Sequence, residues 1–383
     1  MKNLDTELQQ RKAQHLYRSR RISDGPQQPE MIIDGKEVIC FCSNDYLGLA
    51  NHPEVKAAFI KGIEHYGAGS GAAHLINGHS RAHHALEQAL AEFTGYPRAL
   101  LFSTGYMANL GLAQALVGMG DTVLEDRLNH ASLLDGGLLS GARMMRYPHN
   151  AAEDLDTKLA GRTTGEKLVL TDGVFSMDGD IAEVPALANI CQKHGAWLMV
   201  DDAHGFGVLG ANGRGTLEHH GVATADVPIY MATLGKALGT AGAFIAGSDE
   251  LVETLIQKAR TYIYTTASPP AVAEATRASL NIIKSHPELR GRLKNNIHYF
   301  TSCCEQVGIE LTSSQTAIQP VIIGDTRTTV AVSEQLLDQG ILVTAIRPPT
   351  VPEGTARLRI TLSATHSHAH IDKLVTALGV IKQ

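Results

Sequence analysis

The sequence predicts an α/β protein in which a large domain with a mainly parallel mixed sheet is followed by a smaller α+β C-terminal domain. Short apolar runs recur along the middle of the chain, and helical segments separate most of them, which is typical of buried strands covered by helices on both faces. The length of 383 residues exceeds what one simple core supports, so two or three domains are expected. The predicted strands of the large domain are 99–102, 122–125, 167–171, 196–200, 228–232 and 242–247.

The chain before these strands has its own signals. Residues 4–21 are mostly polar and are predicted as a helix that ends in a basic cluster. Asp34-Gly35 lies between two runs rich in β-forming residues, which predicts a hairpin. Residues 55–66 and 85–93 carry apolar side chains at helical spacing and are predicted as two helices.

After residue 269 the pattern changes from alternating strands and helices to a long helical stretch and then a short α+β segment. Three predicted strands, 318–323, 341–346 and 356–362, flank a predicted helix over 326–340, and a last helix is expected near 367–381. We therefore expect an N-terminal arm over 1–44, a large domain over 45–281 and a small domain over 282–383.

Composition excludes several classes of protein. Lys and Arg number 33 against 39 Asp and Glu, and the resulting net charge of −6 argues against nucleic acid as the main partner. The five cysteines are odd in number and include no Cys-x-x-Cys pair, which favours reduced thiols. The polar N-terminus lacks a signal-peptide core, and no run approaches the roughly 18 apolar residues of a membrane span. We expect a cytoplasmic protein with no membrane partner.

Two glycine-rich segments resemble dinucleotide loops but have the wrong context. Residues 67–72 follow a predicted helix rather than a strand. Residues 205–210 follow a strand only after four intervening residues, and the segment after them does not open a helix that could bind a pyrophosphate. A nicotinamide cofactor is therefore disfavoured.

Three other features carry stronger chemical signals. Residues 103–106 follow a strand and open a helix, which is a ready anion site, although an ordinary helix cap explains them as well. Asp201 and His204 follow a buried strand, where open α/β sheets bind ligands, although Asp201 could simply cap a turn. Lys236 lies in an uncharged run, and desolvation there would favour a nucleophilic amine over a solvated surface lysine. Together they are the parts of a pyridoxal phosphate (PLP) site.

Two histidine-rich stretches, 79–88 and 366–372, raise the alternative of a metal site. Neither has cysteine partners at ligand spacing, and both are predicted as polar helical surfaces. We expect solvated faces and no metal.

Several long motifs, in order, resemble those of the α-oxoamine synthases, a family of fold-type I PLP-dependent enzymes. The resemblance covers nearly the whole chain and implies the PLP fold-type I transferase architecture, PLP as cofactor and a homodimer. The motifs are CSNDYLGLA (42–50), EDRLNHASLLDG (125–136), VFSMDGD (174–180), VDDAHGFGVLGANGRG (200–215), TLGKALG (233–239) and IRPPTVPEGTARLRIT (346–361).

The resemblance also implies roles for individual residues. Lys236 would be the Schiff-base lysine and the proton shuttle at the substrate α-carbon, and Asp201 would pair with the pyridinium nitrogen. His204 would lie near the ring hydroxyl, and His130 would stack on the ring face, although a histidine before a helix is more often a cap. The further cofactor contacts that it implies are Gly105, Tyr106, Ser176, Thr233 and, toward the partner subunit, Thr266.

Substrate binding requires a cation for the amino-acid carboxylate. Arg357 and Arg359 are two apart on a predicted strand and so share one face, and we favour Arg359 as the clamp and Arg357 as structural. Asn44 is expected to assist. By resemblance, Thr350 would contact the acyl substrate and Arg18 the acyl chain or its distal carboxylate.

The branch of the family that the motifs resemble most uses L-alanine and a pimeloyl thioester, carried by coenzyme A (CoA) or acyl-carrier protein, in biotin biosynthesis. The implied reaction is a decarboxylative condensation that releases the thiol and carbon dioxide. A sibling that uses glycine, such as 2-amino-3-ketobutyrate ligase or 5-aminolevulinate synthase, is the nearest alternative. A nicotinamide oxidoreductase and a non-catalytic PLP-binding regulator are alternatives of other classes.

Overall fold

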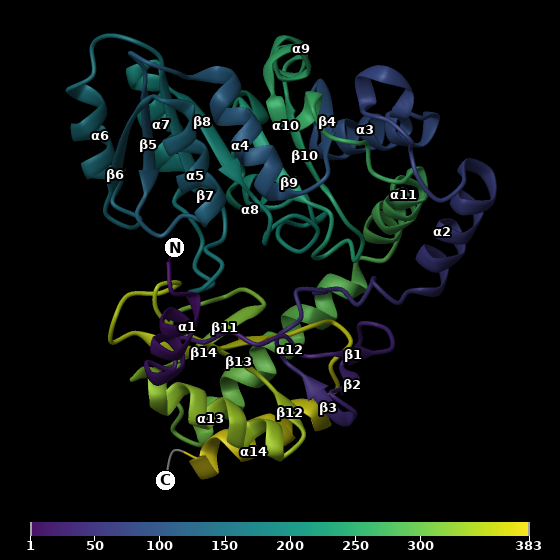
Figure 1. Ribbon diagram of the computed structural model, residues 1–383, viewed down its shortest axis with the longest axis vertical. Helices are drawn as coiled ribbons and strands as arrows, with labels where there is room; N and C mark the ends of the chain where they lie inside the picture. Colours follow the sequence, from purple (N-terminus) through teal and green to yellow (C-terminus); the bar gives the residue numbers. More distant parts are fainter. Residues whose placement is uncertain (1, 382–383) are drawn as a thin grey trace. The chain divides into compact units, whose positions relative to one another are not determined.

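The computed structural model describes residues 2–381 and divides into two compact units (Figure 1). The central unit consists of Leu49–Ser176 and Ile181–Arg290. The terminal unit consists of the chain up to Gly48, the short segment Met177–Asp180 and the chain from Gly291 onward. Each unit has its own sheets, so each is described by itself.

The central unit is built on a seven-stranded sheet in the order β4-β10-β9-β8-β7-β5-β6. Strand β10 runs antiparallel to both of its neighbours, and the other pairings are parallel, which confirms the predicted mainly parallel mixed sheet. The strands are β4 (Arg98–Phe102), β5 (Thr122–Asp126), β6 (Arg143–Tyr147), β7 (Lys167–Asp172), β8 (Trp197–Asp201), β9 (Ile229–Thr233) and β10 (Ala243–Gly247).

Helices of the central unit pack on this sheet and on one another. Their boundaries follow local signals, such as Pro53 in the first turn of α2 and the left-handed Gly95 and Gly195 that end α3 and α7. The helices are α2 (Pro53–Tyr66), η1 (His74–Gly78), α3 (Arg81–Thr94), α4 (Gly105–Leu116), α5 (Ala131–Ser140), α6 (Ala152–Ala160), α7 (Val184–His194), α8 (Thr216–His220), η2 (Thr224–Asp226), α9 (Asp249–Lys258), α10 (Arg260–Ile263) and α11 (Pro270–Ser285).

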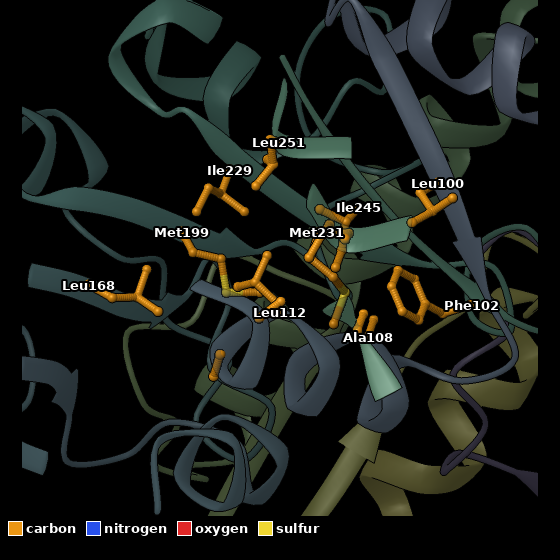
Figure 2. Close-up of a cluster of buried hydrophobic side chains, with 14 of the residues drawn as sticks. Leu100, Phe102, Ala108, Leu112, Leu168, Met199, Ile229, Met231, Ile245 and Leu251 are labelled. Atoms are coloured by element: carbon orange, nitrogen blue, oxygen red, sulfur yellow. The ribbon is translucent and has the colours of Figure 1, made fainter. Parts of the chain in front are cut away.

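The core of the central unit joins α4 to the middle of the sheet. Ala108 and Leu112 of α4 are fully buried and belong to the same cluster as Met199, Met231 and Ile245 of three neighbouring strands (Figure 2). Burial of such side chains stabilises a fold by about 1.5–3 kcal/mol each. The packing therefore fixes α4 against β9 and β10, so the start of the helix is held beside the sheet.

The described part of the terminal unit contains two small sheets and four helices. The first sheet has the order β1-β2-β3-β12, and the second has the order β11-β14-β13. The elements are α1 (Leu4–Ala13), β1 (Ser23–Asp24), β2 (Glu30–Ile33), β3 (Lys36–Cys40), α12 (Glu288–Gln306, beginning at the unit boundary), β11 (Ile318–Gly324), α13 (Thr326–Asp338), β12 (Ile341–Leu342), β13 (Thr344–Ile346), β14 (Ala356–Thr361) and α14 (His368–Ile381).

Local predictions for these elements have mixed outcomes. The hairpin is confirmed, because β2 pairs with β3 and both Asp34 and Gly35 have positive φ, as a tight turn requires. The N-terminal helix is shorter than predicted and ends at Ala13, two residues before the left-handed His15. The stretch predicted as one long helix is two, because Pro287 has no N–H to donate and so cannot continue α11. Among residues 2–381, no helix is both long and apolar enough to span a membrane.

Candidate active site

The carboxyl end of β8 carries Asp201, which is nearly fully buried. Its Oδ2 accepts a hydrogen bond of 2.8 Å from Nδ2 of Asn109 on α4. Its Oδ1 accepts one of 3.1 Å from the backbone N–H of Ala203. The bond from Ala203 is the turn cap that the sequence analysis gave as an alternative role for Asp201. The bond from Asn109 fixes the carboxylate relative to α4. Asp201 is thus a rigidly oriented buried acid at a ligand-binding edge of the sheet.

Lys236 lies in the turn that follows β9, between the buried side chains of Leu234 and Ala237. Its Nζ lies 2.9 Å from Nε2 of His204. His204 itself is buried three residues beyond the end of β8. Because the two nitrogens share one hydrogen bond, a proton can pass between the amine and the imidazole.

His130 is the residue immediately before α5, and its ring caps that helix as the alternative interpretation expected. The backbone N–H of Ser132 donates to Nδ1 of His130. The backbone N–H of His130 donates to the carboxylate of Asp172 at 2.7 Å. Burial lowers the pKa of His130, and the nearby charges of Asp201 and Lys236 also act on it. The ring is therefore an uncharged aromatic surface close to the acid and the amine.

The start of α4 lies close against β9. The side chain of Thr104 accepts a hydrogen bond from the N–H of Met107, which caps the helix. A Cβ atom on Gly105 would lie 2.8 Å from Cγ2 of Thr233, so only glycine fits there without a shift. N–H groups in the first turn of a helix have no partner within the helix, which makes this close-packed helix start suitable for an anion such as a phosphate.

Three further residues were predicted as cofactor contacts: Tyr106, Ser176 and Thr266. Tyr106 is partly exposed, and its hydroxyl donates to the carboxylate of Asp135 on α5. Ser176 lies in the loop beyond β7. Thr266 forms an isolated bridge with Ala73. Contacts of Tyr106, Ser176 and Thr266 with a cofactor stay predictions.

The structure adds three residues that the sequence interpretation missed: Asn109, Ser132 and Asp172. Asn109 donates to both Asp201 and Ser132, and so links the acid to the His130 cap. Asp172 lies directly beside Asp201 in the sheet, and burial, with the charge of Asp201, raises its pKa well above the usual range. Asn109 is polar between the apolar Ala108 and Leu110 of α4, but the sequence did not show which group it would contact.

In the terminal unit, the two arginines of β14 have different partners. Arg357 forms a salt bridge with the carboxylate of Asp178 and is almost fully buried. Arg359 donates from both terminal nitrogens to Oδ1 of Asn44, at 3.2 Å each. The charge of Arg357 is thus paired with an acid, whereas Asn44 orients Arg359 without neutralising it.

The two residues that the resemblance linked to the acyl substrate also meet in the terminal unit. Nη2 of Arg18 donates to the hydroxyl of Thr350 over 3.5 Å, although the residues are 332 positions apart. Both side chains are exposed. The N-terminal arm and the 346–361 motif therefore form one surface.

The prediction of solvated histidine faces is wrong for His83 and His366 and holds for the exposed His84. His83 is fully buried, with Nδ1 accepting from the N–H of Ser80 and Nε2 bonded to the carbonyl of Ser268. His366 is also buried, between the N–H of Ser363 and the carbonyl of Cys40. These histidines pack inward because each satisfies two backbone groups that would otherwise be left unpaired.

The residues of the central unit fit PLP by their chemistry. Lys236 offers an amine for the cofactor aldehyde, Asp201 a buried carboxylate for the pyridine nitrogen, and His130 a neutral ring for its face. The close-packed start of α4 at Gly105 offers N–H groups for the phosphate. This fold and this set of groups define a PLP-dependent transferase of fold type I.

Comparisons with known proteins agree with that class. Residues 36–378 match the family described as aminotransferase class I and II. The chain is 63% identical to the 8-amino-7-oxononanoate synthase of Thioalkalivibrio sulfidiphilus, over 99% of this chain and 97% of the relative. It is 59% identical to the enzyme of the same name from Nitrosococcus oceani, over 97% and 99%.

Solved structures agree as well. A serine palmitoyltransferase from S. paucimobilis with bound PLP is 33% identical, with a TM-score of 0.93 and coverage of 99% of this chain and 96% of that one. An 8-amino-7-oxononanoate synthase from Francisella tularensis is also 33% identical, with a TM-score of 0.78 and coverage of 90% and 96%. The chain belongs to the aminotransferase class I and II family and, within it, to the 8-amino-7-oxononanoate synthases.

Proposed function

We propose that this enzyme condenses L-alanine with a pimeloyl thioester to form 8-amino-7-oxononanoate, with release of carbon dioxide and the thiol of CoA or of acyl-carrier protein. This is the step of biotin biosynthesis that the resemblance implied. One observation carries the proposal: the amine of Lys236 lies 2.9 Å from His204, at the sheet edge that also holds the buried Asp201. That arrangement suits removal and return of a proton at a carbon atom.

Pyridoxal phosphate is the cofactor, held by Lys236, Asp201, His204, His130 and the start of α4. When bound, PLP withdraws electrons from the substrate α-carbon and makes negative charge there tolerable. The contribution of Asp201 is electrostatic, because a fixed carboxylate in a buried setting holds a proton on the pyridine nitrogen. Asn109 holds that carboxylate in place.

Proton transfer falls to the Lys236–His204 pair. The freed amine of Lys236 removes the α-proton of alanine and later returns a proton to the product. The hydrogen bond from His204 positions the amine and accepts or supplies the proton as the amine changes its charge. The apolar neighbours Leu234 and Ala237 limit water around the amine.

Arg359 binds the carboxylate of alanine. A guanidinium can hold both carboxylate oxygens, which fixes the plane of the group and therefore the direction of the bond that breaks on loss of carbon dioxide. Asn44 keeps the guanidinium in position. Arg18 and Thr350 bind the acyl chain or its distal carboxylate on the surface that they form together.

Choice of amino acid separates this function from its siblings. Alanine, glycine and serine are supplied separately, each with pimeloyl, acetyl, succinyl and palmitoyl thioesters, and thiol release is measured. The proposal predicts the fastest release with alanine and pimeloyl thioester. Faster release with glycine would assign the enzyme to a glycine-using synthase, and no release with any pair would leave a binding protein.

The setting of the enzyme is also part of the proposal. It acts in the cytoplasm as a homodimer, with Thr266 directed to the cofactor phosphate of the partner subunit. The large domain predicted over 45–281 binds the cofactor, and the arm over 1–44 and the small domain over 282–383 bind the substrates. Light scattering should give twice the mass of one chain.

A further inference from the structure

A cavity of about 460 Å³ in the central unit is lined by several imidazoles and one carboxylate, and the proposed function does not use it. It lies between η1, α3, β4, α9 and α10. The titratable groups that line it are His74, His79, His84, Glu87, Arg98 and Tyr262.

Three of these side chains converge. His84 and Glu87 are three residues apart on α3, so they lie on the same face of the helix. His79 lies two residues before the start of α3. One donor atom from each of the three lies within 4.8 Å of the other two. Two imidazoles and a carboxylate are ligands that zinc and related divalent metals prefer.

Hydrogen bonds outside this group orient two of its members. Nδ1 of His79 lies 3.0 Å from Nδ1 of His74, which leaves Nε2 of His79 toward the Oε2 atom of Glu87, 3.8 Å away. The backbone N–H of Leu101 donates to Oε1 of Glu87 at 3.0 Å, which leaves Oε2 for another partner. Second partners of this kind hold the ligands of protein metal sites in their coordinating orientation.

Neighbouring groups define which residues can act as ligands. Both ring nitrogens of His83 are bonded to the backbone, so this residue is excluded. His74 stacks on Tyr262 at 5.0 Å and serves as the partner of His79. The cation Arg98 is partly compensated, because its Nε lies 3.7 Å from Asp249 and its Nη1 3.5 Å from Glu253.

We propose that His79, His84 and Glu87 bind a divalent transition metal of the zinc class. With three protein ligands, a tetrahedral ion keeps a fourth position open to the cavity for water or a small ligand. The sequence argument against a metal rested on the lack of cysteine partners at ligand spacing and on predicted polar helical surfaces, whereas this site uses nitrogen and oxygen donors only.

Zinc titration of the chelator-treated holoenzyme, without an affinity tag, tests the site by calorimetry and elemental analysis. We expect one zinc ion per chain. His84→Gln and Glu87→Gln should each weaken zinc binding at least 100-fold, and His74→Phe should weaken it by about 10–100-fold because it removes only the orienting partner. His65→Gln on the exposed surface of α2 is the matched control and should bind zinc as the native chain does.

Absence of a bound zinc ion in the native chain would overturn the proposal, and so would unchanged affinity in His84→Gln. The side chain of His84 is exposed, so this variant is expected to fold even if Glu87→Gln does not. The visible band of bound PLP should persist in His84→Gln with and without zinc. Loss of zinc binding alone therefore leaves the proposed condensation untouched, and loss of the condensation alone leaves the metal site untouched.

Discussion

At the scale of single residues, Arg357 and Arg359 show how neighbours on one strand take different roles. Both are buried on β14, but Arg357 is paired with Asp178, and Arg359 is held by the neutral amide of Asn44. The sequence could place both on one face but could not choose between them, because the choice depends on Asp178, some 180 positions away. The ion pair of Arg357 favours a structural role for it.

Exchange of each arginine for lysine separates the two roles. Arg359→Lys should raise KM for the amino acid and lower kcat/KM by roughly 10–100-fold, because lysine cannot hold both carboxylate oxygens. Its melting temperature should stay close to that of the native enzyme. Arg357→Lys should instead lower the melting temperature and leave KM nearly unchanged. The reverse pattern in steady-state kinetics and thermal melts would assign the clamp to Arg357.

The other candidate site residues differ in whether the sequence alone could identify them. Asp201 and Lys236 could be singled out as candidates because their local context, a strand end and an uncharged turn, already narrows their chemistry. Asn109, Ser132 and Asp172 could not, because each acts through a partner brought close only by the fold. A sequence pattern does not show which distant residues the fold brings into contact.

At the scale of elements, the close contact between α4 and β9 supports the proposed anion site at the start of the helix. Gly105→Ala would place a methyl group 2.8 Å from Cγ2 of Thr233 and 3.4 Å from Cε of Met231. We expect a loss of about 1–3 kcal/mol in stability from the forced shift, together with weaker PLP binding. Thermal melts and cofactor titration measure the two effects. The matched control is Gly118→Ala, whose Cβ meets nothing closer than 3.9 Å; equal behaviour of the two variants would contradict the account.

The turn before α14 provides a pH prediction. Nδ1 of His366 accepts from the N–H of Ser363, Nε2 bonds to the carbonyl of Cys40, and the ring stacks on Phe41 at 4.4 Å. Burial lowers the pKa of His366 from 6.5 to about 4. Between these values the unfolded chain binds a proton that the folded chain does not. This contribution to stability is therefore present above pH 6.5 and is lost as the pH falls toward 4.

His366→Gln isolates that contribution, because the amide does not titrate and can still donate to the carbonyl of Cys40. The native chain should lose about 3 kcal/mol more unfolding free energy than the variant between neutral pH and pH 4. Urea unfolding at a series of pH values measures the difference. Parallel pH profiles for the two proteins would show that His366 is not held neutral.

Elements also show where sequence patterns mislead. The continuous apolar strands were predicted correctly, but β6 was missed because Arg143–Tyr147, at the edge of the sheet, includes two arginines and is not a continuous apolar run. The first helix was predicted too long because polarity alone does not locate its end. His83 of α3 was misjudged because its burial comes from contacts with His74 of η1 and the carbonyl of Ser268 rather than from the helix pattern.

At the scale of the whole molecule, the chain divides its chemistry between two units. The central unit carries the amine, the acid and the helix start expected of a PLP site, and the terminal unit carries the proposed carboxylate clamp and the proposed acyl contacts. The order of the motifs along the chain predicted the family. The terminal unit combines segments from both ends of the sequence, because β3 pairs with β12 and the backbone N–H of Thr361 in β14 donates to the carbonyl of Phe41.

Covalent labelling of the holoenzyme tests the central claim, which is that the Lys236 amine binds PLP. The protein is treated with borohydride, digested and examined by mass spectrometry, with Lys236→Ala in parallel. The account predicts a pyridoxyl-phosphate adduct on the peptide that contains Lys236, and neither adduct nor visible band nor turnover in the variant. An adduct on another lysine, or normal turnover by Lys236→Ala, would contradict it.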